Sequence, residues 1–151
     1  IEEKLKVEGI GSELITTDTK MFSDGYIEVS NIDGNFSLEG SNSRLINESI
    51  LIEAKSIKGI FSNIKDNKEV IFLNIFDEKL SYVKNNETEM YANNIIFDNE
   101  ISIIELINNV TIIRDGEKIT GDYGTLDTKN NSYKIKSNDQ TKVKVVIQND
   151  E

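Results

Sequence analysis

Residues 32–38 and 106–112 follow one pattern of residue types, and this echo constrains the fold more than any single residue does. The two copies read Ile-Asp-Gly-Asn-Phe-Ser-Leu and Leu-Ile-Asn-Asn-Val-Thr-Ile, at a spacing of 74 residues (106 − 32). Each copy begins with an apolar residue, continues with a Gly-Asn or Asn-Asn step that is typical of a tight turn, and then alternates apolar and polar residues. The echo predicts a chain built from two repeated β units.

The echo continues on both sides of this turn, in the same order in both halves of the chain. An apolar-x-small-polar element opens each unit, a Phe-Ser or Phe-Asp step follows, and spaced apolar residues come next. Several matches in one order favour two related units over chance. The matched blocks are residues 15–18 and 90–93, 22–23 and 97–98, Ile27 and Val29 with Ile101 and Ile103, and 52–55 with 119–122.

Turn signals divide the sequence into short runs rich in β-forming residues. Such spacing is typical of an all-β sandwich, barrel or solenoid. The clearest hairpin joins residues 110–114 to residues 117–122 through Asp115-Gly116, because Asp-Gly favours the positive φ angles of a type I′ turn. The turn signals are Asp24-Gly25, Asp33-Gly34, Asp66-Asn67, Asn85-Asn86, Asn108-Asn109, Asp115-Gly116, Asn130-Asn131 and Asn138-Asp139.

Individual runs differ in how many of their faces are apolar. Residues 26–30 and 142–145 alternate, which predicts one buried and one solvated face, whereas residues 70–73 and 101–104 are apolar on both faces. Ile46, Ile50, Ala54 and Ile57 also fit a helical stripe. We favour strand there, because residues 52–55 belong to the echo, and expect at most a short helix near residues 43–50. No linker is visible, so residues 1–151 are expected to form a single domain.

Composition argues against several classes of function. The net charge is −10, with 17 basic residues scattered among 27 acidic ones, which argues against binding to nucleic acid. Histidine and cysteine are absent, so thiolate nucleophiles and the commonest general base and transition-metal ligands are absent too. We expect no enzymatic activity, no cofactor and no metal site. The candidate acids are interpreted as turn or strand-edge residues: Asp18, Asp98, Asp122 and Asp127.

The ordered elements resemble the OstA-type domain of lipopolysaccharide transport proteins, and most of all its LptA-like bridge members. The family pattern is an apolar-x-Ala-Asp-like strand, a Tyr/Phe-acidic step, a Leu-x-Gly-Asn-Val-x-apolar turn and a second apolar-x-Ala-Asp strand. Residues 90–93, 97–98, 106–112 and 119–122 carry it in the second half, and the likeness spans roughly residues 12–147. The departures are Asn108 for the turn glycine, Gly121 for alanine and Lys55 for the acidic residue.

The resemblance implies a fold and a function. The fold would be an open, twisted, V-shaped stack of antiparallel strands, of the β-taco or jelly-roll kind. Its apolar inner face would hold the acyl chains of lipopolysaccharide, and the protein would be periplasmic, with a signal peptide presumed removed. The partners implied are lipopolysaccharide and related β-domains of the inner-membrane-anchored and outer-membrane components, with a head-to-tail homo-oligomer as a further expectation.

The alternating strands supply candidate residues to line such an apolar trough. The same residues would also line a closed β-sandwich core, and a one-residue slip in register would turn each of them outward. We expect the inner face, and the lipid-binding residues, to include Phe36, Leu38, Ile52, Ile71, Leu73, Ile103, Val110, Ile112, Ile119 and Ile135. Tyr91, Tyr123 and Tyr133 are expected to make cross-strand packing contacts.

An open stack would leave unpaired backbone groups on its first and last strands. We expect these edges at residues 14–18 and 142–147, where strand addition would join neighbouring domains. Two alternatives remain: the periplasmic domain of the membrane-anchored component, LptC, which a retained N-terminal anchor would distinguish, and a purely structural β-repeat module, which would not bind amphiphiles.

Overall fold

The computed structural model describes residues 4–62, 69–138 and 143–147. Within these ranges all regular secondary structure is β-strand. The twelve strands form one antiparallel sheet, which confirms the all-β expectation and the choice of strand over helix at residues 43–50. The short strands are β1 (Lys4–Glu8), β2 (Ser12–Ile15), β3 (Thr19–Ser23), β4 (Tyr26–Ser30), β11 (Ser132–Lys136) and β12 (Lys144–Ile147). The long strands are β5 (Asn35–Asn47), β6 (Ile50–Phe61), β7 (Val70–Asn85), β8 (Thr88–Asp98), β9 (Ile103–Arg114) and β10 (Glu117–Asp127).

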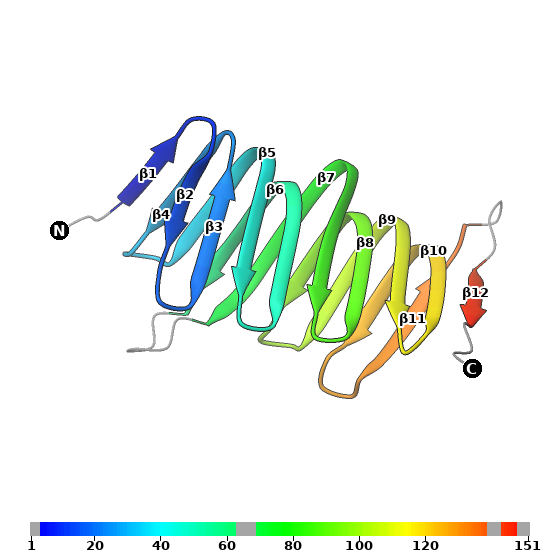
Figure 1. Cartoon of the computed structure of the whole chain (residues 1–151). Helices are drawn as coiled ribbons and strands as arrows, with labels where there is room; N and C mark the ends of the chain where they lie inside the picture. Colours follow the sequence, from blue (N-terminus) through cyan, green and yellow to red (C-terminus); the bar gives the residue numbers. More distant parts are fainter. Residues whose placement is uncertain (1–3, 63–68, 139–142, 148–151) are drawn as a thin grey trace.

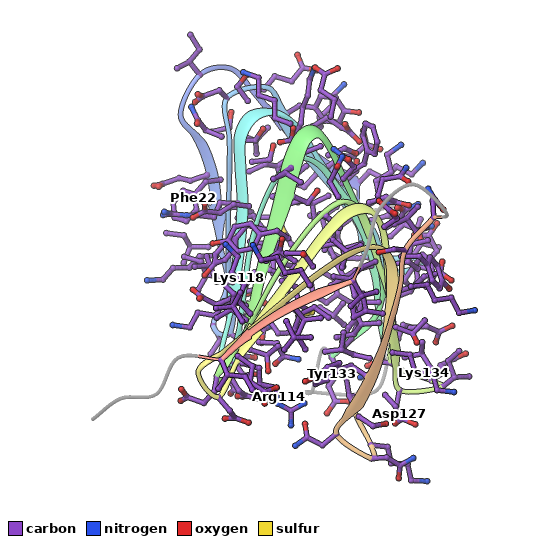
Figure 2. The ribbon with its side chains drawn as sticks, turned by 90° about the vertical axis from the view of Figure 1, so that its right-hand side faces the viewer. Phe22, Arg114, Lys118, Asp127, Tyr133 and Lys134 are labelled. Atoms are coloured by element: carbon purple, nitrogen blue, oxygen red, sulfur yellow. The ribbon has the colours of Figure 1, made fainter. Side chains whose placement is uncertain are left out.

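Each long strand bends near its middle and so contributes to two walls of the sheet. The register shifts at the bend, for example between Glu39 and Ser43 in β5 and between Phe76 and Ser81 in β7. Wall A has the order β1-β4-β5-β6-β7-β8-β9-β10-β11, and wall B is formed by the other halves of β5 to β10 with β2 and β3 at one end and β12 at the other. Figure 1 shows the resulting zigzag, and Figure 2 shows the two walls from the C-terminal end.

Left-handed backbone residues and small residues explain where the strands bend. Gly40 (φ 126°) and Asn42 (φ 57°) lie at the bend of β5, and Asn108 (φ 66°) and Asn109 (φ 55°) lie at the bend of β9. Glycine and asparagine enter this region of φ more readily than other residues do. The apolar-x-small-polar blocks 52–55, 90–93 and 119–122 fall at the bends of β6, β8 and β10, where a small side chain leaves room for the opposite wall.

The 74-residue echo therefore joins a turn to a bend rather than two equivalent turns. Gly34 lies in the turn between β4 and β5, whereas Asn108 and Asn109 lie inside β9. Block 15–18 likewise lies at the end of β2 and the turn that follows, not at a bend. The turn before β5 and the bend of β9 both need a positive φ angle, so glycine or asparagine occupies both. The unit that repeats in space is a single bent strand.

The hairpin predicted around Asp115-Gly116 is present. β9 ends at Arg114 and β10 begins at Glu117, and their residues pair in antiparallel register. Asp115 and Gly116 have φ angles of 51° and 77°, as a type I′ turn requires. This turn places the ends of β9 and β10 at the open side of wall B, which matters for the site described below.

Candidate functional site

Three rows of apolar side chains line the inner faces of the two walls from one end of the stack to the other. Each row is a run of directly paired residues, so its members share one face. Wall A carries the rows Val7-Ile27-Leu38-Ile57-Ile75-Ile95-Leu106-Gly124-Ile135 and Leu5-Val29-Phe36-Gly59-Leu73-Phe97-Ile104-Leu126-Tyr133. Wall B carries Leu14-Met21-Leu45-Ile52-Val83-Met90-Ile112-Ile119-Val145. We call them the inner rows.

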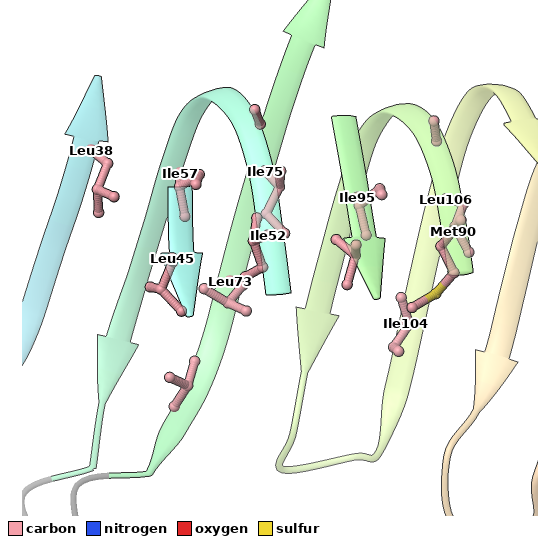
Figure 3. Packing of buried hydrophobic residues seen from close by; sticks show 14 of the residues in the cluster. Leu38, Leu45, Ile52, Ile57, Leu73, Ile75, Met90, Ile95, Ile104 and Leu106 are labelled. Atoms are coloured by element: carbon pink, nitrogen blue, oxygen red, sulfur yellow. The ribbon is translucent and has the colours of Figure 1, made fainter. Parts of the chain in front are cut away.

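The inner rows form one continuous apolar cluster. Figure 3 shows Leu38, Ile57, Ile75, Ile95 and Leu106 following one another across neighbouring strands, with residues of the other rows beside them. Most of these side chains are almost completely shielded from solvent. A surface of this kind offers a hydrocarbon chain contact with aliphatic groups, at about 0.8 kcal/mol for each methylene group removed from water.

Seven of the ten expected lining residues are buried on the inner face. They are Phe36, Leu38, Ile52, Leu73, Val110, Ile112 and Ile119. Ile135 is half-buried, packs against the same cluster and ends one inner row. For these eight residues the structure places the side chain on the inner face, and their contact with lipid stays a prediction.

Two expected lining residues lie elsewhere. Ile103 pairs with Asp98 and Asp127, and its neighbour Ile104 is the buried one, so Ile103 faces outward. Ile71 lies at an irregularity in the pairing of β6 with β7, between the buried Val70 and Leu73, and is half-buried outside the cluster. Both segments are apolar on both faces, so alternation could not reveal which residue points inward.

Serines form a polar strip along the bends, which sequence reasoning missed. The hydroxyl groups of Ser12 and Ser43 donate to the carbonyl oxygens of Gly9 (2.7 Å) and Gly40 (2.8 Å), and that of Ser81 donates to Asn93 O (3.3 Å). The Ser23 hydroxyl donates to Glu39 O (3.0 Å). These buried hydroxyl groups satisfy backbone carbonyls at the bends of β5 and β8 and in the turn between β1 and β2. Ser43 and Ser81 directly follow the bends of β5 and β7, whereas Ser12 and Ser23 flank turns next to β2 and β3.

At the two ends of the stack the inner rows reach solvent. Leu5 in β1 is 50% exposed, and Val145 in β12 is 52% exposed. Val145 pairs with the buried Ile119, so its side chain continues the inner face of wall B beyond the last long strand. The apolar lining therefore does not stop where the core stops.

The predicted edges are confirmed in wall B. Within the described residues, β2 pairs with β3 alone and β12 pairs with β10 alone. Residues 16–18 lie beyond the end of β2, and Lys142 lies outside the described residues. Wall A has two further edges, β1 and β11, which the sequence analysis did not identify. Each end of the stack thus presents one edge strand from each wall.

A cavity of about 360 Å³ opens on the side opposite the bends, near the C-terminal end. Its lining combines turn residues 85–88 and 114–115 of wall B with residues 127–128 and 131–132 of wall A. Met90, Ile104 and Leu126 of the inner rows also line it. We call this opening the mouth cavity, because it connects solvent to the apolar interior.

Aromatic and charged side chains cover the outer face of wall B. Tyr82 and Tyr91 pair across β7 and β8 with ring centroids 4.9 Å apart, as cross-strand packing predicts. The Tyr82 hydroxyl donates to Glu89 Oε1 (2.8 Å), and burial together with that carboxylate raises the pKa of Tyr82. The Arg44 guanidinium lies 4.9 Å from the centre of the Phe22 ring.

The candidate acids occupy turns and strand ends. Asp127 Oδ1 accepts the backbone N–H groups of Lys129 and Asn130 (both 3.0 Å), and these hydrogen bonds, above all that of Asn130, lower the pKa of Asp127. Asp98 Oδ1 accepts the N–H of Glu100 (3.1 Å), and Asp122 Oδ2 accepts that of Asn138 (2.8 Å). Asp18 is exposed between β2 and β3. These positions agree with the turn interpretation.

Two absences among the described residues complete the description of the site. These residues contain no group of three or more His, Cys, Asp or Glu side chains placed to hold a metal ion. They also contain no helix with the length and apolarity of a membrane span.

The bent strands, the two walls and the apolar interior define an LptA-like fold of the β-jellyroll kind, as the resemblance implied. A solved structure with this fold is LptH from Pseudomonas aeruginosa, described as the LptA-homologous periplasmic component of the conserved lipopolysaccharide transport device. The match has a TM-score of 0.67 and 16% sequence identity, and covers 87% of this chain and 95% of LptH. No protein-family model and no curated protein matches the sequence.

Proposed function

We propose that this protein is a periplasmic carrier that holds the acyl chains of lipopolysaccharide between its walls and passes them along a bridge from the inner to the outer membrane. The observation that carries the proposal is the set of three inner rows, each continuous across the stack, with Leu5 and Val145 exposed at the ends of two of them. The proposed role is binding and transfer, without covalent chemistry.

The chemistry of the interior supports acyl chains as the cargo. The inner rows present aliphatic and aromatic side chains, and their polar neighbours are serines already bonded to carbonyl oxygens at the bends. A hydrocarbon chain needs contact without directional partners, and such a surface provides it. The sugar-phosphate part of the ligand would stay outside, where the net charge of −10 offers it no cationic cradle.

The edges support transfer between domains. β1 and β2 at one end, and β11 and β12 at the other, carry unpaired backbone groups beside exposed apolar inner-row residues. Pairing with the edge of a related domain, or of a second copy head to tail, would extend both the sheet and the inner rows. The partners we propose are the inner-membrane-anchored and outer-membrane components of such a bridge.

A matched pair of phenylalanines in wall A tests the proposal. Phe97 belongs to an inner row and is half-buried, whereas Phe76 follows the inward-facing Ile75 and points outward, 49% exposed. A photo-crosslinking phenylalanine analogue is placed at either position, and the purified protein is irradiated with lipopolysaccharide. We expect an adduct at Phe97 and little or none at Phe76.

Phe76 is the control for solvent exposure, because it is more exposed than Phe97. If crosslinking only followed accessibility, Phe76 would give more adduct than Phe97, and the proposed function would be wrong. Absence of adducts at both positions, in variants that retain the circular dichroism spectrum of the intact protein, would favour the purely structural β-repeat module.

A further inference from the structure

At the C-terminal end, side chains of wall B reach across the mouth to wall A. Arg114 Nη1 donates to the carbonyl oxygen of Asn131 (3.2 Å), and the Tyr133 hydroxyl donates to Glu117 Oε2 (3.0 Å). The Arg114 guanidinium also lies 5.9 Å from the centre of the Tyr133 ring. Figure 2 shows Arg114 and Tyr133 near each other on the open side of the V. We call Arg114, Glu117, Asn131 and Tyr133 the clasp.

The clasp borders the mouth cavity. Arg114 and Asn131 belong to the lining of that cavity, together with Met90, Ile104 and Leu126 of the inner rows. Those three side chains are 0%, 2% and 6% exposed, so the cavity leads from solvent to side chains that are otherwise enclosed. Here, polar links between the walls and access to the apolar interior coincide.

Tyr133 connects the clasp to the core. Its ring is half-buried, packs against the core cluster and ends the inner row that contains Leu126. Its hydroxyl is held by Glu117, and burial together with this carboxylate raises the pKa of Tyr133. Since β11 is an edge strand paired with β10 alone among the described residues, the clasp supplies its attachment to wall B. Release of the hydroxyl would let β11 and its ring move away from Leu126.

We propose that the clasp is the gate of a lateral portal, through which a hydrocarbon chain of an amphiphile enters the inner rows sideways at the C-terminal end. This inference rests on the proposed function, because it names the route by which that cargo reaches the same interior. The inner-row side chains of the two walls are closely packed, so a chain can pass between them only when the walls separate. A chain entering beside the clasp meets Met90, Ile104 and Leu126 first.

The test compares two tyrosines of wall A, each of which donates a hydrogen bond to a glutamate: Tyr133 to Glu117 across the mouth and Tyr123 to Glu105 within the wall. Tyr133→Phe removes the clasp hydrogen bond and keeps the ring in the core. Tyr123→Phe is the matched control, because the Tyr123 hydroxyl donates to Glu105 Oε2 (2.6 Å) on the outer face of the same wall. Binding of cis-parinaric acid, a fluorescent polyene fatty acid, is followed by stopped-flow fluorescence. A third variant, Arg114→Ala, removes the link to Asn131.

We expect both clasp variants to bind and release the probe faster than the intact protein, with a similar ratio of the two rates. A hydrogen bond to a carboxylate corresponds to a rate change of about tenfold when it is lost only in the open state. Tyr123→Phe is expected to leave both rates unchanged. Unchanged rates in the clasp variants, or an equal acceleration in Tyr123→Phe, would overturn the proposal.

A measurement without ligand separates this inference from the proposed function. Hydrogen exchange of the β11 amides, residues 132–136, is compared in the intact protein, Tyr133→Phe and Tyr123→Phe. We expect faster exchange in Tyr133→Phe alone. If the intact protein binds no probe, the proposed function fails, and exchange then decides the gate: acceleration in Tyr133→Phe alone supports it, and unchanged β11 exchange overturns it.

Discussion

The middle and the ends of the stack continue the same inner rows but enclose them to very different degrees. In β6 and β7, Ile52, Ile57 and Ile75 have no exposed side-chain surface. At the ends, Leu5 and Val145 belong to two of these rows and are 50% and 52% exposed. An inner strand has a neighbour on each side, whereas an edge strand has one.

This difference separates stability from interaction. The middle strands supply the buried apolar area that holds the sheet together, and a change there is felt by both walls. The terminal strands add little burial but present apolar side chains and unpaired backbone groups to solvent, which is where a second molecule can add. Substitutions in the middle strands should therefore lower stability, whereas changes to the terminal strands should mainly weaken association with a second molecule.

The largest expected effect is a charge in the middle of the stack. Ile112, which is 1% exposed, has no polar partner for a carboxylate in its inner row, so Ile112→Asp should destabilise the fold by several kcal/mol. Val145→Asp places the same charge in the same row at the exposed end, and its cost should stay within about 0.5 kcal/mol. Urea unfolding followed by circular dichroism checks both; similar losses would contradict the comparison.

A smaller loss is expected from a methyl group at Gly59. A Cβ there would lie 2.4 Å from Cζ of Phe36 and 2.7 Å from the carbonyl oxygen of Phe72, so the strand or the ring would have to move. Overpacking of this kind costs about 1–3 kcal/mol. Gly59→Ala should therefore lower the midpoint of urea unfolding, and a midpoint equal to that of the intact protein would show that the middle of the stack yields more than we infer.

Removal of the C-terminal edge should affect association more than stability. Deletion of residues 142–151 removes β12, whose four pairs with β10 form one edge of wall B. We expect the shortened chain to retain its β-rich circular dichroism spectrum and to lose one end of any concentration-dependent association. Analytical ultracentrifugation of both forms measures this, and equal assembly of the shortened chain would exclude β12 as a docking edge.

The smallest expected effect is the loss of stability at low pH that Asp24 causes at the bend of β5. Asp24 accepts hydrogen bonds from the Asn42 side chain (2.6 Å) and the Gly11 backbone (3.0 Å), and these lower the pKa of Asp24, with Asn42 the larger cause. The stabilising contribution is therefore full above the ordinary pKa of 3.8 and is lost as pH falls through the lowered value.

Asp24→Asn should lower stability slightly at neutral pH and remove this part of the acid dependence. Urea unfolding of both proteins between about pH 6 and pH 2 measures the difference. Parallel curves across that range would show that Asp24 does not hold the bend through its carboxylate.

Much of the fold followed from the sequence, because period-two alternation and turn residues are local signals. The Asp115-Gly116 hairpin follows from these signals, whereas the wall B edges at β2 and β12 follow from the open stack that the resemblance implies. The bends were not, because Asn108-Asn109 in β9 uses the same residues as a turn. In residues 70–73 and 101–104 both faces are apolar, so alternation does not show which residue points inward. Ile103 is therefore expected on the inner face, where the structure has Ile104.

The candidate site was predictable in its middle and not at its margins. Alternation identifies Leu38 and Val110 as inner residues because each is flanked by polar ones. The clasp joins Arg114 to Asn131 and Glu117 to Tyr133, and these contacts depend on how two walls face each other across the mouth. No local pattern encodes that geometry.

The most direct test of the central claim is the separation of the walls when lipopolysaccharide binds. Spin labels are attached at Glu87, in the β7–β8 turn of wall B, and at Glu100, in the β8–β9 turn of wall A, both exposed. A second pair, Glu48 and Glu87, lies in two turns of wall B alone. Electron paramagnetic resonance distances should lengthen for the first pair and not for the second when ligand is added. Lipopolysaccharide binding with both distances unchanged would contradict the account.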